Sequence, residues 1–79
     1  MEVENVFLIF YADTPNGELN KLFRWRISSI LAWRERLSYF IKKGFLIRSA
    51  YLEEKGINQR ISEYEIQGII DDIISSKRR

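Results

Sequence analysis

A turn signal between two strand-forming runs constrains the fold of this chain more than any other feature. The run from Val3 to Ala12, VENVFLIFYA, is apolar and aromatic, and its length suits a buried strand better than a helix. The next residues, Asp13 to Gly17, are DTPNG. Proline presets φ for the first corner of a type I turn, and Asn-Gly tolerates left-handed φ. We therefore expect the chain to reverse here into a β-hairpin.

The segment that follows the turn, from Leu19 to Ile27, is compatible with two structures. As a helix it would continue into the next segment and form one long helix from Glu18 to Lys43. The turn chemistry favours a strand instead, and Ser28-Ser29 offers an N-cap for a separate helix. As a strand the segment alternates between two faces, Phe23, Trp25 and Ile27 on one and Leu22, Arg24 and Arg26 on the other. On this basis Trp25 is expected to pack in the core, under the helices.

Two helices are predicted from apolar stripes at helical spacing. The first covers residues 29–43 and ends at Gly44, a residue type that commonly closes a helix. The second starts after Ser62, which forms a capping box with Glu65. Trp33 falls on the first stripe and is expected in the core. The stripes are Ile30, Trp33, Leu37, Phe40 and Ile41 in the first helix, and Ile66, Ile69, Ile70, Ile73 and Ile74 in the second.

A second hairpin is predicted between the helices, from a strand over Phe45–Glu53, a turn at Glu54–Gly56 and a short strand over Ile57–Ile61. The predicted fold class is therefore α+β, with the order ββαββα. The simplest packing is one mainly antiparallel four-stranded sheet with both helices on one face. The expected organisation is a single small domain over residues 1–76, followed by a basic C-terminal tail at 77–79.

Composition excludes several kinds of chemistry. The 79 residues contain no cysteine and no histidine, so disulfides, the usual zinc ligands and the commonest general base are absent. The four glycines are isolated and form no phosphate loop. We expect no enzyme activity, no cofactor and no metal. No apolar run reaches the ~20 residues of a membrane span and the start lacks a basic signal region, so we expect a cytoplasmic protein without a membrane partner.

The net charge of +2 conceals an uneven distribution. Residues 18–48 carry eight lysines and arginines against two glutamates, a net charge of +6. Residues 49–76 carry two basic residues against six acids, a net charge of −4. A basic middle beside an acidic end indicates a surface that attracts an anionic partner.

The arginines provide the strongest candidate site. If Trp25 faces the helices, Arg24 and Arg26 face away from them, because successive strand residues point to opposite sides. Arginine binds phosphates and stacks on bases, so such a face is a candidate for binding nucleic acid or another anion. The alternatives are a solvated sheet face and burial in a dimer. The arginines of this face are Arg24, Arg26, Arg48 and Arg60, and Leu22, Leu46 and Leu52 are expected beside them.

A second, weaker basic feature lies on the flank of the first helix. Arg36 and Lys43 fall on one side at helical spacing, with Tyr39 between them and Ala32 before them. One aromatic ring and two cations are compatible with nucleic-acid binding. An ordinary solvated helix face is the favoured interpretation of these residues.

The first strand raises the question of self-association, because both of its faces are apolar. Val6, Leu8 and Phe10 alternate with aromatic and aliphatic neighbours, and helices cover only one face of a sheet. The other face is covered either by a second protomer or by arginine stems. We therefore expect a small non-catalytic binding module whose partner is a nucleic acid or, alternatively, another protein, including a second copy in a homodimer.

Overall fold

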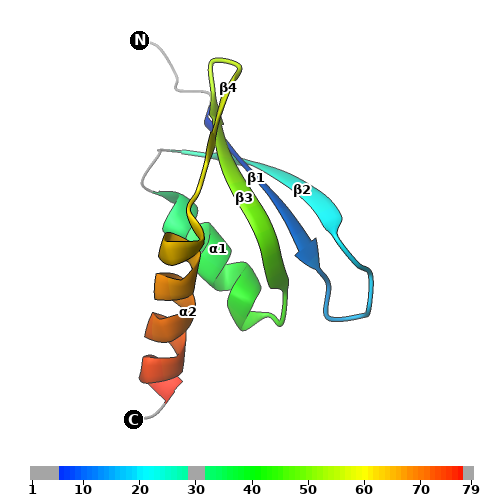
Figure 1. Cartoon of the computed structure of the whole chain (residues 1–79), viewed down its shortest axis with the longest axis vertical. Helices are drawn as coiled ribbons and strands as arrows, with labels where there is room; N and C mark the ends of the chain where they lie inside the picture. Colours follow the sequence, from blue (N-terminus) through cyan, green and yellow to red (C-terminus); the bar gives the residue numbers. More distant parts are fainter. Residues whose placement is uncertain (1–5, 29–31, 78–79) are drawn as a thin grey trace.

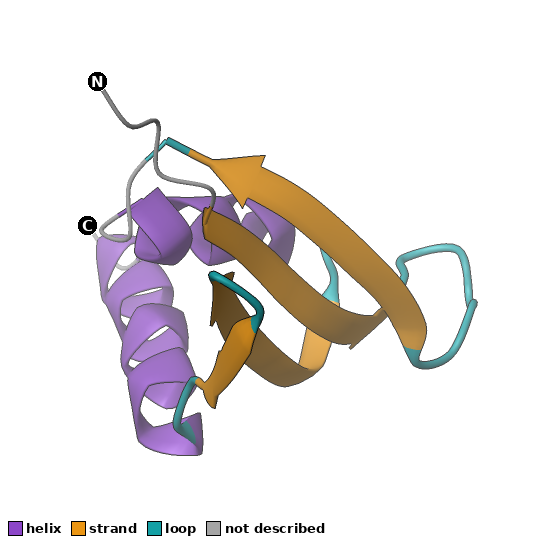
Figure 2. Cartoon of the chain, turned by 90° about the horizontal axis from the view of Figure 1, so that it is seen from above, coloured by secondary structure: helices purple, strands orange, loops and turns teal. Residues whose placement is uncertain are grey.

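The computed structural model describes residues 6–28 and 32–77 and confirms the predicted fold class. Four strands form one antiparallel sheet in the order β2-β1-β3-β4, and both helices lie on one side of it (Figures 1 and 2). The elements are β1 (Val6–Asp13), β2 (Lys21–Ile27), α1 (Trp33–Lys42), β3 (Leu46–Glu54), β4 (Ile57–Arg60) and α2 (Glu63–Lys77).

The first hairpin forms as the turn signal predicts. β1 pairs with β2 along the whole of β2, from Ala12 opposite Lys21 to Val6 opposite Ile27. Gly17 has φ of 95°, the left-handed conformation that glycine adopts without strain. Because Lys21–Ile27 is a strand, the alternative of one helix from position 18 to 43 is wrong.

The core lies between the sheet and the two helices. Every second residue of β1, starting at Val6, is fully buried on this side. Trp33 is 9% exposed, which confirms its predicted place in the core. Ile70 is only partly buried, Ile74 is 49% exposed, and Ile30 lies outside the described residues. The buried residues of the two helices are Trp33, Leu37 and Phe40 in α1, and Ile66, Ile69 and Ile73 in α2.

Helix α1 starts later than predicted and ends where predicted. Its N-cap is Ala32, whose side chain cannot accept a hydrogen bond, so the prediction that Ser28-Ser29 provides the N-cap is wrong for the helix that begins at Trp33. Ser28 is exposed, and Ser29 lies outside the described residues. At the other end, the Phe45 N–H donates to the Phe40 carbonyl at 3.1 Å, and the two rings lie 5.2 Å apart. Together with Gly44 at φ of 98°, these contacts form a Schellman motif.

The second hairpin is shorter at its outer strand. β4 has four residues, all exposed, and ends at Arg60. Ser62 then caps α2, since its Oγ accepts a hydrogen bond from the Glu65 N–H at 3.2 Å. α2 packs mainly against α1 and continues through Lys77, one residue into the predicted tail. Neither described helix combines the length and the apolar composition needed to cross a membrane.

A bulge in β3 changes which residues face the helices. The register between β1 and β3 shifts between Tyr11 and Ala12, so Arg48 is the extra residue on β3. Beyond the bulge, Leu52 lies opposite the buried Leu8 and packs against the core. The prediction that Leu52 shares a face with the arginines is therefore wrong.

Candidate nucleic-acid interface

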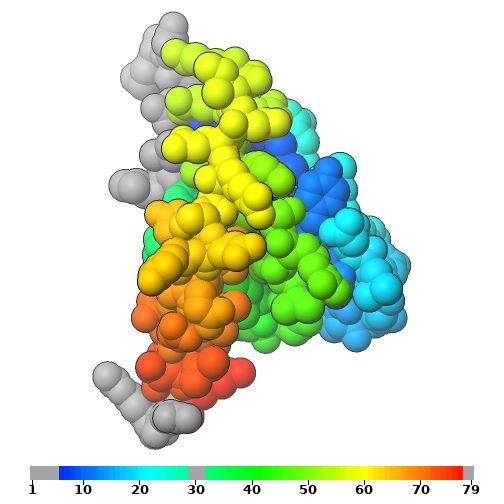
Figure 3. Space-filling model, in the orientation of Figure 1, coloured from blue at the N-terminus to red at the C-terminus, as the bar shows by residue number. Residues whose placement is uncertain are grey.

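The sheet face away from the helices, which we call the open face, carries an aromatic centre with arginines around it. Phe7, Ile9 and Tyr11 of β1 are half-buried there, and their side of β1 reaches the surface between β2 and β3 (Figure 3). Their cross-strand partners on this face are Arg26, Arg24 and Leu22 of β2, and Glu53, Tyr51 and Ser49 of β3. The predicted orientation of Arg24 and Arg26 therefore agrees with the strand register.

Arg24 lies across the centre of the open face. Its guanidinium carbon is 3.8 Å from the centroid of the Phe7 ring, a cation–π distance. Its Nη2 is 3.3 Å from Oε1 of Glu53, which belongs to the strand beyond β1. Arg24 therefore covers part of the outer side of β1 at Phe7.

Arg48 is held by an acid at the end of β1. Its Nη2 and Nε lie 2.5 and 3.1 Å from Oδ2 of Asp13, whose side chain is only 14% exposed. Oδ1 of Asp13 accepts the Asn20 N–H at 2.8 Å, so one carboxylate ties the hairpin loop to β3. These hydrogen bonds, first the one from Arg48 and then the one from Asn20, lower the pKa of the Asp13 carboxyl from its usual value. The geometry gives Arg48 a structural role.

Arg60 borders a hollow on the β4 side of the open face. It lies opposite Tyr51, and its guanidinium is 3.9 Å from the Glu63 carboxylate, a long ion pair between exposed groups. The hollow has a volume of 310 Å³ and is lined by Ile9, Tyr11, Tyr51, Asn58 and Arg60. Tyr51 was not predicted on this face because its facing depends on the bulge in β3. Asn58 lies two residues before Arg60 on β4, so the alternation that assigned Arg60 to this face would also have placed Asn58 here.

Arg26 differs from the other three arginines. It is exposed and lies opposite Phe7, and none of the ion pairs within residues 6–28 and 32–77 includes it. Its charge is thus the most available on this face for a ligand phosphate. The open face therefore brings Arg24 and Arg26 together on one strand. Arg24, Arg48 and Arg60 each have an acidic partner, and Arg26 has none among the described ion pairs.

The helix side of β2 presents Trp25 to solvent. Trp25 faces the helices as predicted, but it is 42% exposed, so its expected burial in the core is wrong. β2 is an edge strand of the sheet, and the Phe40 ring of α1 lies 5.8 Å from the Trp25 ring. The guanidinium carbon of Arg36 lies 5.9 Å from the centroid of the Trp25 ring.

The predicted basic flank of α1 continues this surface. Tyr39 is 53% exposed, and Nζ of Lys43 lies 5.5 Å from the centroid of its ring. Ala32, expected on the same side, is half-buried. The two cations of the flank are thus each paired with an exposed aromatic ring, and one of these rings comes from the sheet. Sequence spacing within α1 did not reveal the pairing of Arg36 with Trp25.

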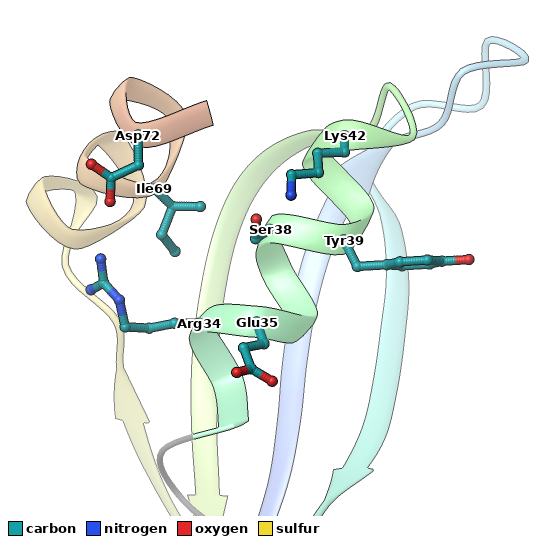
Figure 4. Close-up of a pocket in the computed structure, with 7 residues that line it drawn as sticks. All are labelled: Arg34, Glu35, Ser38, Tyr39, Lys42, Ile69 and Asp72. Carbon is teal, nitrogen blue, oxygen red and sulfur yellow. The ribbon is translucent and has the colours of Figure 1, made fainter. Parts of the chain in front are cut away.

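A groove between α1 and α2 carries charges of both signs. Arg34 and Lys42 extend toward α2 while Tyr39 points the other way (Figure 4). Glu35 and Asp72 also line this groove, whose volume is 380 Å³. Its mixed charges make it a weaker candidate for an anionic partner than the β2 side.

The charge asymmetry of the sequence becomes an asymmetry in space. The basic segment 18–48 supplies β2 and α1, whereas the acidic segment 49–76 supplies β4 and most of α2.

The chain matches no protein-family model, no curated protein and no solved structure. A function therefore rests on the chemistry of these surfaces.

Proposed function

We propose that this protein is a non-catalytic module that binds nucleic acid through the β2 side of its open sheet face. The observation that supports this function is the arrangement of Arg24 and Arg26 beside Phe7. Arg26 has an exposed guanidinium outside the described ion pairs, and Arg24 already stacks on an aromatic ring. Phosphates are neutralised by arginines, and bases stack on aromatic side chains with little sequence preference.

The rings of the open face supply the second part of the proposal. Phe7 and Tyr11 come from β1 and Tyr51 from the neighbouring β3, so they lie on the two central strands of the sheet. One common kind of RNA-binding domain is a four-stranded sheet whose aromatic side chains stack two or three unpaired bases. The rings in the centre of the sheet can stack on bases, and the arginines on the adjacent β2 can contact phosphates of the same nucleic-acid chain. The cytoplasmic location remains a prediction.

Fluorescence anisotropy with labelled oligo-dT and oligo-U tests this function. Binding is expected to weaken steeply with salt, and the double variant Arg24→Ala, Arg26→Ala should lower the salt slope by about 0.7 per lost phosphate contact. The matched control is Arg34→Ala with Lys77→Ala, which removes the same charge from α1 and α2 outside the open face. Both variants should keep the fold, because exposed substitutions usually change stability by within ~0.5 kcal/mol.

Two results would contradict the proposal. The first is that the native chain binds neither oligonucleotide at low salt. The second is that the two double variants weaken binding equally. The second outcome would show that net charge alone, rather than the Arg24 and Arg26 face, attracts the oligonucleotide.

The alternative function is association with another protein, including a second copy. Leu22 and Leu46 favour it, since they are 54% and 53% exposed and lie near the same end of the open face. A homodimer built there would bury the arginines that nucleic-acid binding requires. Sedimentation across the micromolar range separates the two functions. A dimer that Leu22→Lys dissociates would support the alternative, and a monomer would exclude self-association.

A further inference from the structure

The helix side of β2 carries a second aromatic and basic surface, which we call the Trp25–Tyr39 surface. It consists of Trp25 of β2 and Tyr39 of α1, with Arg36 beside the first ring and Lys43 beside the second. Both rings are largely exposed, at 42% and 53%. Each ring can therefore accept a base on its accessible area while the adjacent cation contacts a phosphate.

One buried ring fixes the positions of both exposed rings. Phe40 is 8% exposed, and its centroid lies 5.8 Å from that of Trp25 and 5.4 Å from that of Tyr39. Phe40 also contacts Phe10, which is fully buried in β1. The two exposed rings are thus held against the core before any ligand binds. Preorganised rings lose little conformational freedom on binding, which favours affinity.

The position of Trp25 connects this surface with the open face. Arg24 and Arg26, its neighbours in sequence, point to the other side of the same edge strand. A ligand that passes over the outer edge of β2 contacts the arginines on one side and Trp25 on the other. A single strand of nucleic acid is flexible enough to turn around such an edge, whereas a duplex is stiff over this length.

We propose that single-stranded nucleic acid crosses the β2 edge and stacks bases on Trp25 and Tyr39, with Arg36 and Lys43 at its phosphates. This inference rests on the proposed function and extends it in two respects. It names the ligand as single-stranded, and it places part of the binding site on the helix side of the sheet.

Intrinsic tryptophan fluorescence tests the crossing directly, because the second tryptophan, Trp33, is 9% exposed. Unlabelled oligo-dT and oligo-U of about 12 nucleotides serve as probes, one for DNA and one for RNA. Either probe should quench the fluorescence of the native chain, and Trp25→Phe should abolish the quench while an aromatic ring remains. A duplex that contains the same oligo-dT should bind more weakly and leave the fluorescence unchanged.

Affinity measurements give an independent readout. Trp25→Ala and Tyr39→Ala should each weaken binding roughly 5- to 150-fold, the range that corresponds to the loss of one base stack. The matched control is Tyr64→Ala on α2, which removes a ring that is 91% exposed and distant in the fold from β2. That variant should bind like the native chain.

The outcomes distinguish failure of this inference from failure of the proposed function. Oligonucleotide binding that depends on Arg24 and Arg26 without a Trp25 quench would overturn the crossing and leave the open face as the site. Equal affinities for Trp25→Ala and Tyr64→Ala would do the same. If Trp25→Ala fails to fold, Trp25→Phe and Tyr39→Ala still decide the question. Absence of all binding would overturn both proposals.

Discussion

The two ββα halves of this protein have the same order of elements but differ in charge and in their outer strand. In the first half, β2 has seven residues that pair along β1 and carry aromatic rings on one side and arginines on the other. In the second half, β4 has four residues, all exposed, and α2 contributes acids in its first turn. Both halves bury apolar side chains in the same core.

The two halves contribute alike to the stability of the core but unequally to the proposed binding surface. Leu37 of α1 and Ile69 of α2 are equally part of the core, whereas cations beside exposed rings gather around β2 and α1. The repeated topology thus supplies packing from both halves, whereas the proposed binding surface comes mostly from the first half, with Tyr51 of β3 as the contribution of the second. Substitutions in each half provide the means to test this separation.

The largest expected effect is on stability and should be similar in the two halves. Leu37→Ala and Ile69→Ala each remove a buried aliphatic side chain and should lower the free energy of unfolding by about 2–5 kcal/mol. Ile74→Ala is the control, because Ile74 is 49% exposed and should cost much less. Urea denaturation measures all three. A large loss from only one of the two buried positions would show that the halves do not share one core.

Glycine substitutions sharpen the comparison at the junction of the halves. Gly44 has φ of 98°, and an added Cβ would lie 3.4 Å from Cγ of Pro15, so Gly44→Ala should cost about 1–2 kcal/mol. Gly68 lies inside α2 with nothing within 4 Å of an added Cβ. Gly68→Ala should therefore stabilise the protein by up to about 1 kcal/mol. Urea denaturation measures the free energy of unfolding of both variants. If Gly44→Ala and Gly68→Ala changed it in the same direction, this account of the two glycines would be contradicted.

The smallest expected effect concerns the Asp13–Arg48 ion pair, which joins β1 of the first half to β3 of the second. The pKa of Asp13 is lowered in the folded protein, so its ionised form stabilises the fold above the ordinary aspartate pKa. This contribution is lost as pH falls through the folded-state pKa. Thermal unfolding from about pH 6 to about pH 3 should show a shallower acid-induced loss for Asp13→Asn than for the native chain. An equal acid-induced loss of stability in Asp13→Asn and in the native chain would exclude a stabilising role for the ionised Asp13.

The sequence predicted the elements of the fold well because each depends on local signals. The strand at 21–27 follows from the alternation of Phe23, Trp25 and Ile27 after a turn, and the end of α1 follows from Gly44. The start of α1 was missed because Ser28-Ser29 has the composition of a cap, whereas the helix begins after Ala32. Polar residue types near a helix start do not identify which residue adopts the cap.

The candidate site was predicted less completely because it depends on contacts between distant residues. Alternation assigned Arg48 and Leu52 to one face, but the bulge at Arg48 reverses the facing of the rest of β3 and places Tyr51 on the open face. Trp25 was expected in the core because its side of the strand faces the helices. Its exposure follows from the edge position of β2, which is a property of the sheet order rather than of the sequence pattern.

The edge position of β2 also affects how the protein behaves at high concentration. An edge strand offers unpaired backbone groups to other chains, and charged side chains along it oppose aggregation. Lys21, Arg24 and Arg26 lie along this edge, so two molecules approaching strand to strand would bring like charges together. The arginines proposed to hold a ligand therefore also protect solubility, and variants that lack them are best compared with the native chain at low protein concentration.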